Sequence, residues 1–420
     1  MVKQAIFDWI DDHREQMVSF LQDIVRIPSV TGDEAEIQAF IADYLQKMGC
    51  DVDMFVPSLD ELKTHPAFVP VDASYDDRPN VVAIIAGSGG GRSLLFNGHV
   101  DVIPEGPPGK WEHGCWSGDI ADGRVYGRGT SDMKSGVAAF TMALYALITN
   151  GIQLQGDIIA EYVMDEELSG NGTLACVMKG YRADAGICCE TSSMHIQPAS
   201  IGRIWFEIHI IGKAAGIQTR FEGVSGIELG YKVTKIVEAH EAERLKTVLH
   251  PLYPNIRESI PCMVGMFESG SYASAFPDEC VLRGSLATVP GEDSRAVMDA
   301  FVAYVLEHSK DDPWMALHPP KIEFKGYFAD PSAIPVDSPI VQCLVDSFEK
   351  TMGVSPKITG RQGAADIRFL NEYGGTPTVI FGPGRTEQMH ANNEWVAIDD
   401  YIDSIKILVH TIIDWCGVDG

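Results

Sequence analysis

The sequence is poor in positive charge. Lysine and arginine total 32 residues against 59 aspartates and glutamates, so the formal net charge is −27. Nucleic acids and anionic membranes are bound through basic patches, and we therefore expect neither as a partner. Long apolar runs are also missing, since none approaches the roughly 20 residues of a membrane-spanning helix. Residues 1–28 carry mixed charge and an amphipathic helical pattern instead of a secretory signal.

Cysteine forms no recognisable framework. The nine cysteines are odd in number and scattered, without a C-x-x-C spacing. The adjacent Cys188 and Cys189 are poor disulfide partners. Such usage is typical of a reducing compartment, and we therefore expect a cytoplasmic protein.

The length of 420 residues predicts two domains, because one compact core seldom grows so large. In the first two hundred residues helical and strand-like patterns alternate, which predicts a largely parallel sheet covered by helices. From Ile201 the pattern changes to that of a small α+β sandwich, and after Pro331 the alternation returns. We therefore place a catalytic domain at 1–200 and 330–420, with a lid domain inserted at 201–329.

Individual elements follow from apolar and amphipathic segments. Strands are expected at Asn80–Ile85, Leu94–Asn97, Asp157–Met164, Ala185–Cys189, Arg203–Ile211 and Pro377–Phe381. Helices are expected at 1–28, Glu34–Met48, Gly136–Ile148, 226–240, Pro339–Met352 and 398–416. The Pro- and Asp-rich segment 57–79 is interpreted as a surface excursion, and Gly87–Gly91 as a hairpin loop.

Acidic and histidine side chains gather where predicted strands end. His99 and Asp101 lie two residues apart on an extended chain, so their side chains point to the same face. Asp132 follows, and Glu166 and Glu167 close the next strand. A lone histidine or a glutamate pair usually lies on a solvated face, but three clusters at strand ends of one α/β pattern predict a metal site. Other histidines are interpreted as structural and not as metal ligands: His113, His195, His209, His240 and His250.

Further motifs have the order and spacing of a known family. Ile27-Pro28-Ser29 opens the match, Cys189-Glu190-Thr191 follows the clusters above, and the phrase from Met389 to Glu394 closes it. The chain resembles, nearly end to end, the zinc aminopeptidase-like family of acetylornithine deacetylase, succinyl-diaminopimelate desuccinylase, aminoacylase and bacterial glutamate carboxypeptidase. The resemblance implies a zinc-exopeptidase type of α/β fold. It also implies a lid that forms a homodimer or a higher homo-oligomer.

The resemblance assigns metal ligands residue by residue. His99 and Glu190 would bind one ion, Glu167 and His390 a second, and Asp132 would bridge the two. Imidazole and carboxylate donors suit Zn²⁺, Mn²⁺ or Co²⁺, and two ions can share a bridging carboxylate. We therefore expect one or two such divalent ions as the cofactor.

The same motifs imply a hydrolytic reaction. In the family, the residue at Glu166 is the general base and the residue at Asp101 supports His99. Two divalent ions lower the pKa of bound water and stabilise a developing oxyanion. A carboxylate beside that water takes its proton and passes it to a leaving nitrogen. The sequence therefore predicts a metal-dependent hydrolase that cleaves a C–N bond, amide or N-acyl, of a small carboxylate-bearing substrate.

Three positions depart from the family around the substrate. Relatives carry a histidine that reaches across the dimer to the substrate carbonyl, and Gly216 stands in its place. Ser274 replaces a usual asparagine, and Ala287 a usual arginine. Losing an oxyanion donor costs an amidase about 3 kcal/mol of transition-state stabilisation. Either another group such as Gln218 or Arg220 has taken over, or the substrate has no ordinary amide carbonyl.

The loop Gly360–Asp366 also differs from the family loop that it replaces. Arg361 could hold a substrate carboxylate through two parallel hydrogen bonds, or it could simply pair with a neighbouring acid. With Gly363, Arg220 and Ser274 it completes the set of candidate substrate contacts.

Two other functions remain open. The missing histidine allows an aminohydrolase that replaces the amino group of an activated aromatic amine such as nitroanthranilate. Attack on a ring carbon puts negative charge into the ring, so a donor to a carbonyl oxygen would have less to do. The other alternative is a non-catalytic protein that keeps this fold for binding. Such proteins generally lose ligands or the base, and this chain keeps both.

Overall fold

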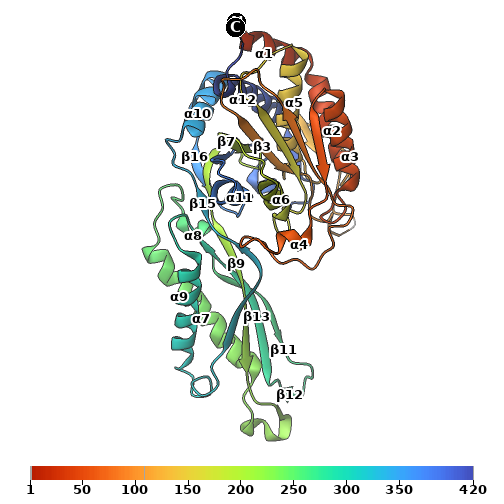
Figure 1. Ribbon diagram of the computed structural model, residues 1–420. Helices are drawn as coiled ribbons and strands as arrows, with labels where there is room; N and C mark the ends of the chain where they lie inside the picture. Colours follow the sequence, from red (N-terminus) through yellow and green to blue (C-terminus); the bar gives the residue numbers. More distant parts are fainter. Residues whose placement is uncertain (1, 108, 420) are drawn as a thin grey trace. The chain divides into compact units, whose positions relative to one another are not determined.

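The computed structural model describes residues 2–107 and 109–419 (Figure 1). The chain divides into two compact units. The first, called the large unit, comprises Met1–Ala199, Ala333–Thr359 and Ala365–Gly420. The second, called the inserted unit, comprises Ser200–Ser332 together with Gly360–Ala364. No local sequence pattern indicates that Gly360–Ala364 belongs to the inserted unit.

A long mixed sheet forms the core of the large unit (Figure 1). Its strands follow the order β1 (Asp51–Phe55), β2 (Asn80–Ile85), β6 (Ile158–Val163), β3 (Leu94–His99), β7 (Ala185–Cys188), β17 (Thr378–Ile380), β8 (Ile196–Ser200) and β15 (Ser332–Ala333), with β16 (Ile358–Arg361) beside β8. The central strands β6, β3, β7 and β17 are parallel. Strands β1 and β2, β2 and β6, and β17 and β8 pair antiparallel. The predicted α/β fold with a largely parallel sheet is confirmed.

Strand β3 shows why this sheet is covered by helices on both faces. Leu94, Leu95 and Phe96 are all fully buried. Successive side chains of a strand point to opposite faces, and accordingly Leu94 and Phe96 belong to one apolar core and Leu95 to another. The covering helices are α1 (Val2–Asp12), α2 (Arg14–Arg26), α3 (Ala35–Lys47), α4 (Leu59–Leu62), α5 (Lys134–Thr149), α6 (Asn171–Lys179), α10 (Pro339–Met352), α11 (Ile367–Glu372) and α12 (Ile398–Cys416).

The N-terminal helix differs from its prediction, because the pattern over 1–28 forms two helices. His13 leaves the helical backbone conformation, with φ −109° and ψ 21°, and separates α1 from α2. Its Nδ1 contacts the carbonyl oxygen of Trp9 at 2.8 Å. The apolar periodicity continues across the break, so periodicity alone does not show it.

Two loops also differ from their predictions. Gly87–Gly91 joins β2 to β3, but β6 lies between these strands, so the loop is not a hairpin. The supposed surface excursion 57–79 begins with α4 and contains the buried residues Leu62 and Tyr75. Both errors have one cause, since strand order and burial depend on partners far away in the sequence.

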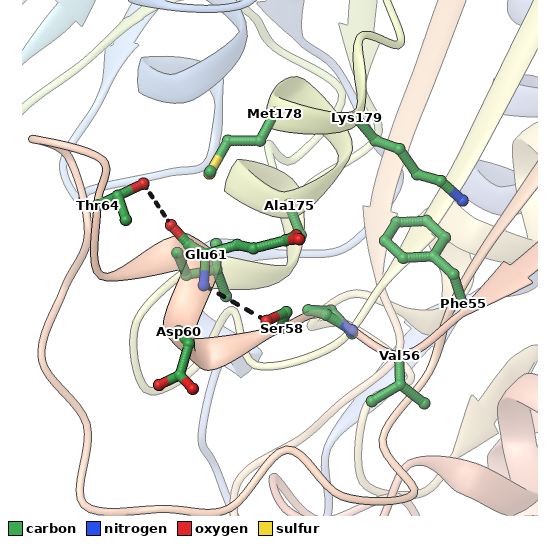
Figure 2. A pocket seen from close by; sticks show the side chains of 11 residues that line it. Phe55, Val56, Ser58, Asp60, Glu61, Thr64, Ala175, Met178 and Lys179 are labelled. Atoms are coloured by element: carbon green, nitrogen blue, oxygen red, sulfur yellow. Dashed lines mark hydrogen bonds between the residues drawn. The ribbon is translucent and has the colours of Figure 1, made fainter.

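The excursion forms one wall of a groove of about 590 Å³ between α4 and α6 (Figure 2). Phe55, Leu62 and Met178 give it an apolar lining, while Asp60 and Lys179 add charges of both signs. The groove is lined by the ends of β1, α4 and α6, whereas the acidic clusters follow β3, β6 and β7. It is therefore a feature separate from the candidate metal centre.

The inserted unit is an antiparallel sheet with helices on one face (Figure 1). Its strands follow the order β11 (Met263–Ser269), β13 (Glu279–Thr288), β9 (Gly202–Ile211) and β14 (Lys321–Ala329), and its long helices are α7 (Gly226–Thr247) and α9 (Ser294–Ser309). Along β9 alternate residues from Ile204 to Ile210 are buried with apolar side chains of both helices. The short elements are β10 (Ala215–Gly216), η1 (Ile217–Glu222), α8 (Ile256–Ser259) and β12 (Ala275–Phe276).

A further small sheet joins distant parts of the large unit. Strands β4 (Asp119–Ala121), β5 (Arg124–Tyr126) and β18 (Trp395–Ala397) pair antiparallel. The segment after β5 contains Asp132, and the segment before β18 contains His390. Pairing of β5 with β18 therefore brings two predicted ligand loops together.

In the described part of the chain no helix is long and apolar enough to cross a membrane. The nine cysteines are all free thiols.

Candidate metal centre

The acidic clusters meet at one edge of the large sheet. His99 is the last residue of β3, Glu166 and Glu167 follow β6, and Glu190 follows β7. These three strands are parallel neighbours, so their carboxyl ends lie at the same edge. Asp132 and His390 reach this edge from loops, and contacts within 4 Å join both to the strand-end residues.

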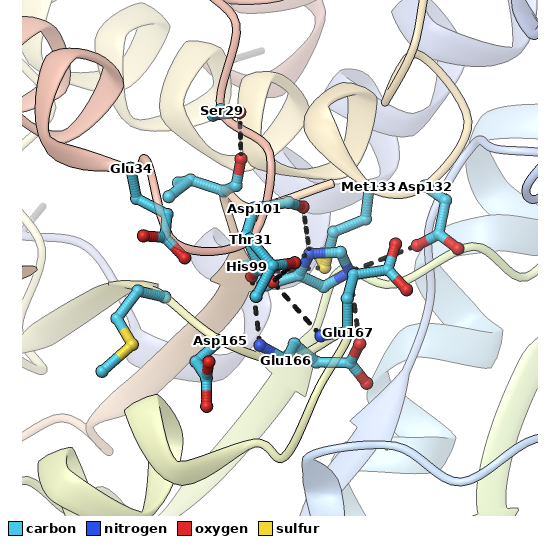
Figure 3. Close-up of polar contacts among 12 residues, drawn as sticks. Ser29, Thr31, Glu34, His99, Asp101, Asp132, Met133, Asp165, Glu166 and Glu167 are labelled. Atoms are coloured by element: carbon cyan, nitrogen blue, oxygen red, sulfur yellow. Dashed lines mark hydrogen bonds and ion pairs between the residues drawn. The ribbon is translucent and has the colours of Figure 1, made fainter. Parts of the chain in front are cut away.

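A first donor group consists of His99, Asp132 and Glu190, whose ligand atoms all lie within 4.8 Å of one another. His99 Nε2 lies 3.2 Å from Asp132 Oδ1 and 3.9 Å from Glu190 Oε1. All three residues are buried. Figure 3 shows His99 and Asp132 pointing toward one another.

A second donor group shares Asp132 with the first and adds Glu167 and His390. His390 Nε2 lies 3.0 Å from Glu167 Oε2 and 3.4 Å from Asp132 Oδ2. The two oxygens of Asp132 thus face different histidines, Oδ1 toward His99 and Oδ2 toward His390. A carboxylate in this arrangement could bridge two ions.

Donor chemistry and spacing both fit divalent ions. Nitrogen and oxygen ligands lie about 2.0–2.2 Å from a zinc ion, so two ligands of one tetrahedral ion lie roughly 3.3–3.6 Å apart. The contacts in the two groups run from 3.0 to 3.9 Å. Contacts with Asp132 and Glu167 raise the pKa of His390 to about 10, as expected where carboxylates concentrate negative charge. These five residues could therefore hold two divalent ions.

The Asp101 carboxylate contacts the backbone of the glutamate pair. It accepts hydrogen bonds from the backbone N–H groups of Glu166 at 3.1 Å and of Glu167 at 3.3 Å, and from the Thr31 hydroxyl at 2.8 Å (Figure 3). His99 Nδ1 lies 2.9 Å from the backbone carbonyl oxygen of Asp101 and 3.6 Å from its carboxylate. Burial raises the pKa of Asp101 to about 7. The carboxylate thus contacts the Glu166–Glu167 segment more closely than it contacts the imidazole.

Glu166 lies beside the first donor group, with Oε2 at 3.8 Å from His99 Nε2. Its side chain is only 12% exposed, and burial raises its pKa well above the usual value. The neighbouring Glu167 points to His390 instead. Two adjacent glutamates therefore present their carboxylates to different parts of the same centre.

A buried network of ion pairs and hydrogen bonds lies next to the Glu166–Glu167 segment. It was not predicted from the sequence. Arg78 donates to both carboxylate oxygens of Glu34 at 2.7 and 2.6 Å, and to Asp165 Oδ1 at 2.8 Å. The Tyr75 hydroxyl donates to the other oxygen of Asp165 at 2.7 Å. Asp165 directly precedes Glu166, so the network anchors the glutamate segment. No local signal indicates it, because Arg78 and Tyr75 lie in the supposed surface excursion.

The inserted unit places two of the departures from the family side by side. Gly216 in β10 pairs with Ala275 in β12, and the N–H of Ile217 donates to the carbonyl oxygen of Ser274 at 3.1 Å. Arg220 follows in η1 and lies over the Phe221 ring, with Cζ 4.8 Å from the ring centroid. A Cβ built on Gly216 meets only one atom within 4 Å, so this backbone has room for a side chain.

The third departure from the family, Ala287, and the remaining substrate candidates, Arg361 and Gly363, lie elsewhere in the inserted unit. Ala287 is buried in β13, directly opposite Arg203 of β9. Sequence reasoning missed that this arginine stands beside the position where the family arginine is replaced. Arg361 is buried, and its carbonyl oxygen accepts a hydrogen bond from the Tyr253 hydroxyl at 3.2 Å. Gly363 lies near the Arg361 guanidinium, since a Cβ built there would be 3.6 Å from Nε.

One histidine interpreted as structural belongs to a third acidic group. His209 lies with Glu207 and Glu323 on the face of the inserted sheet away from α7 and α9, and all three are partly buried. Cations already neutralise this group, because Arg283 pairs with Glu207 at 2.6 Å and Lys325 with Glu323 at 2.5 Å. We interpret it as an ion-pair network rather than as a metal site.

Comparison with known proteins places the chain in a family. Residues 95–414 match the model of peptidase family M20/M25/M40. An N-formyl-4-amino-5-aminomethyl-2-methylpyrimidine deformylase of Halalkalibacterium halodurans is 30% identical over 442 residues, covering 99% of this chain and 98% of the relative. A succinyl-diaminopimelate desuccinylase of Hydrogenovibrio crunogenus is 24% identical, covering 95% of this chain and 98% of the relative.

Solved structures show the same fold. A tripeptidase from Staphylococcus aureus has a TM-score of 0.74 at 21% identity, covering 96% of this chain and 98% of that one. A Bacillus subtilis peptidase described as dinuclear and metal-binding has a TM-score of 0.65 at 14% identity, covering 96% of this chain and 99% of that one.

These comparisons bear on the alternatives that the sequence left open. Both relatives are named as enzymes that act on C–N bonds, which argues against a non-catalytic protein. Neither of these relatives favours the aminohydrolase. The chain belongs to peptidase family M20/M25/M40 and is a metal-dependent hydrolase that acts on C–N bonds.

Proposed function

We propose that His99, Asp132 and Glu190 bind one divalent ion and that Asp132, Glu167 and His390 bind a second. The observation that carries this proposal is the shared carboxylate of Asp132, whose oxygens face the histidines of two donor groups. Donors of this kind suit Zn²⁺, Mn²⁺ or Co²⁺. The pair would supply an acidified water molecule and a positive charge for the oxygen of the scissile carbonyl.

Glu166 is the general base in this proposal. Its carboxylate lies beside the first donor group and is held there through Asp101, which accepts hydrogen bonds from the backbone of both Glu166 and Glu167. From this position it takes a proton from the attacking water and returns it to the leaving nitrogen. Asp101 is thus a positioning residue for the base as well as for His99.

For the substrate, we propose the N-formyl amide of an aminomethyl-pyrimidine. The support is a relative with this activity that is 30% identical over nearly the whole of both chains. The chemistry agrees with Gly216, where the family carries a histidine. A formyl carbon bears hydrogen in place of an alkyl group, so it is less hindered and more electrophilic than an acetyl carbon. It therefore needs less polarisation by a hydrogen-bond donor.

A carboxylate-bearing N-acyl substrate is the second candidate. The desuccinylase relative, 24% identical over 95% of this chain, supports it. Arg361, Arg220 and Arg203 are cations that could take a carboxylate. The two candidates differ in acyl group and in charge, so one set of substrates separates them.

A matched set of formyl, acetyl and succinyl amides tests the substrate proposal. With Mn²⁺ or Zn²⁺ present, we expect the formamide of an aminomethyl-pyrimidine to be hydrolysed about 10–200-fold more efficiently than its acetamide, because the two differ by one methyl group. The measurement is kcat/KM for each substrate. Faster cleavage of the succinyl amide would instead support the second candidate, and faster cleavage of the acetamide would contradict the preference for a formyl group.

The variant Gly216→His is the control for the missing donor. The backbone at Gly216 leaves room for the side chain, since a new Cβ meets only Gln218 Oε1, at 3.8 Å. An added imidazole should raise activity on the acetamide more than on the formamide. Equal changes for both would show that the acyl preference does not depend on this position.

We further propose that two copies of the chain associate through the inserted unit. Its edge strand β11 exposes Met263, Met266 and Phe267, each at least 43% accessible. The neighbouring helix α7 exposes Ile227 and Tyr231, at 49 and 60%. A sheet edge with an apolar flank is unfavourable in water and is commonly covered by a partner.

Sedimentation velocity tests this association. We expect a dimer or a larger even oligomer at micromolar concentration, and a monomer for Met266→Glu, which places a charge in the proposed interface. Trp205→Glu is the control, because Trp205 is exposed on β9, away from this edge. A monomeric wild-type protein would contradict the proposal.

A further inference from the structure

Glu394 is a buried glutamate at the end of the loop that carries His390. Its side chain is 0% exposed, although glutamate is seldom fully buried without partners. It belongs to the motif phrase of the sequence analysis, where it received no role. The structure shows which partners compensate its charge.

Each oxygen of Glu394 accepts two hydrogen bonds from the loop before α5. Oε1 accepts from the backbone N–H groups of Ser131 at 2.8 Å and Asp132 at 3.0 Å. Oε2 accepts from the N–H of Gly129 at 3.0 Å and from the Arg128 guanidinium at 2.8 Å. Gly129 has φ +84°, a conformation that favours glycine and turns the backbone toward the carboxylate.

The same contacts connect the two loops that contain Asp132 and His390. Arg128 Nη1 also donates to the carbonyl oxygen of Ala391, the residue after His390, at 2.9 Å. The N–H of Gly127 donates to the carbonyl oxygen of Glu394 at 3.0 Å. Asp132 and Glu394 are 262 positions apart in the chain, so no local interaction could set this geometry.

We propose that Glu394 is a positioning residue for the metal centre, and that its carboxylate fixes Asp132 against His390. The proposal rests on the metal ligands assigned under the proposed function. Asp132 belongs to both donor groups. His390 lies on the loop before β18, and Glu394 is the last residue of that loop. Hydrogen-bond partners that orient metal ligands typically contribute a factor of about 10–100 to metal affinity.

Glutamine in this position tests the proposal sharply. Glutamine has nearly the same shape, but one of its two terminal atoms is an NH₂ group, which donates and does not accept. In one orientation the NH₂ faces the N–H groups of Ser131 and Asp132. In the other it faces Gly129 and Arg128. Either orientation opposes donors to donors and loosens the loop that carries Asp132.

The experiment measures affinity for Mn²⁺ and Zn²⁺ in Glu394→Gln by competition with a chelator, and the number of ions retained after dialysis by mass spectrometry. We expect an affinity about 10–100-fold lower than that of the wild type, with loss greatest for the more weakly held ion. Unchanged affinity for both ions would overturn the proposal. Thermal unfolding of the metal-free proteins separates this effect from a general loss of stability.

Glu292→Gln is the matched control. Glu292 of the inserted unit accepts hydrogen bonds from the Arg244 guanidinium at 2.8 and 2.7 Å and from the N–H of Val289 at 2.9 Å. It is thus a carboxylate with similar partners that contacts no candidate ligand loop in the described residues. Its loss should lower stability and leave metal affinity unchanged. An equal loss of metal affinity in both variants would show a global effect and overturn the positioning role.

A second variant serves if Glu394→Gln does not fold. Arg128→Lys keeps the charge, but the lysine nitrogen is one bond nearer the backbone than Arg128 Nη1, the atom that donates to both Glu394 and Ala391. We expect a smaller but measurable loss of metal affinity, and wild-type affinity would contradict the proposal. Wild-type protein that binds no divalent ion would overturn the assigned metal centre and this inference together. Wild-type binding with unaffected variants would overturn this inference alone.

Discussion

Replacing Glu166 by glutamine is expected to slow amide hydrolysis by about 10²–10⁴-fold, the usual contribution of a general acid–base group. Glutamine occupies the same space beside His99, but it cannot take a proton from water. Glu166 belongs to neither donor group found among the described residues. The number of metal ions per chain and the unfolding temperature should therefore stay at wild-type values. The measurements are kcat on the best amide substrate, metal analysis and thermal unfolding.

The adjacent Glu167→Gln variant is the natural comparison. Glu167 contacts His390 at 3.0 Å and belongs to the second donor group. Its substitution should lower both metal content and activity, whereas Glu166→Gln should lower activity alone. Full turnover by Glu166→Gln, or loss of metal from it, would exclude Glu166 as the base. The two variants thus separate proton transfer from metal binding at neighbouring positions.

Replacing Arg78 by methionine is expected to destabilise the large unit by about 3–5 kcal/mol, because it leaves buried carboxylates without their counter-charge. Arg78 is 3% exposed, and the side chains of Glu34 and Asp165 are fully buried. Methionine fills much of the space but compensates neither charge. The measurement is the midpoint of the urea transition of the large unit, followed by a probe of its sheet and helices.

Arg283→Met is the control for the loss of an arginine. Its guanidinium pairs with Glu207 at 2.6 Å and Glu268 at 2.8 Å, but its side chain is 39% exposed. Exposed ion pairs contribute little to stability, so this variant should unfold close to the wild type. If both variants lost the same stability, burial would not be the cause. Arg78→Met should in addition lower activity, because Asp165 precedes the glutamate pair.

Much of the large unit could be predicted because its signals are local. The apolar run Leu94–Phe96 favours a buried strand, and the mostly apolar sequence of helix α5 favours a helix buried along nearly its whole length. Strand ends then predict where His99, Glu167 and Glu190 gather, because parallel neighbours share an edge. The prediction of a hairpin at Gly87–Gly91 was wrong because the order of strands in a sheet is not a local property. Strand β6, which separates its two strands, comes more than sixty positions later in the chain.

The sequence by itself determined the class of fold, the family and the kind of chemistry. Periodicity, strand ends and motifs can be read from the sequence directly, because they do not depend on contacts with distant parts of the chain. Only the tertiary structure decided how the centre is held. Arg78 joins Glu34 to Asp165, and Glu394 joins the loops of Asp132 and His390. Buried charges are stable only when they are paired, and here the partners lie far away along the chain. A local sequence pattern therefore cannot identify them.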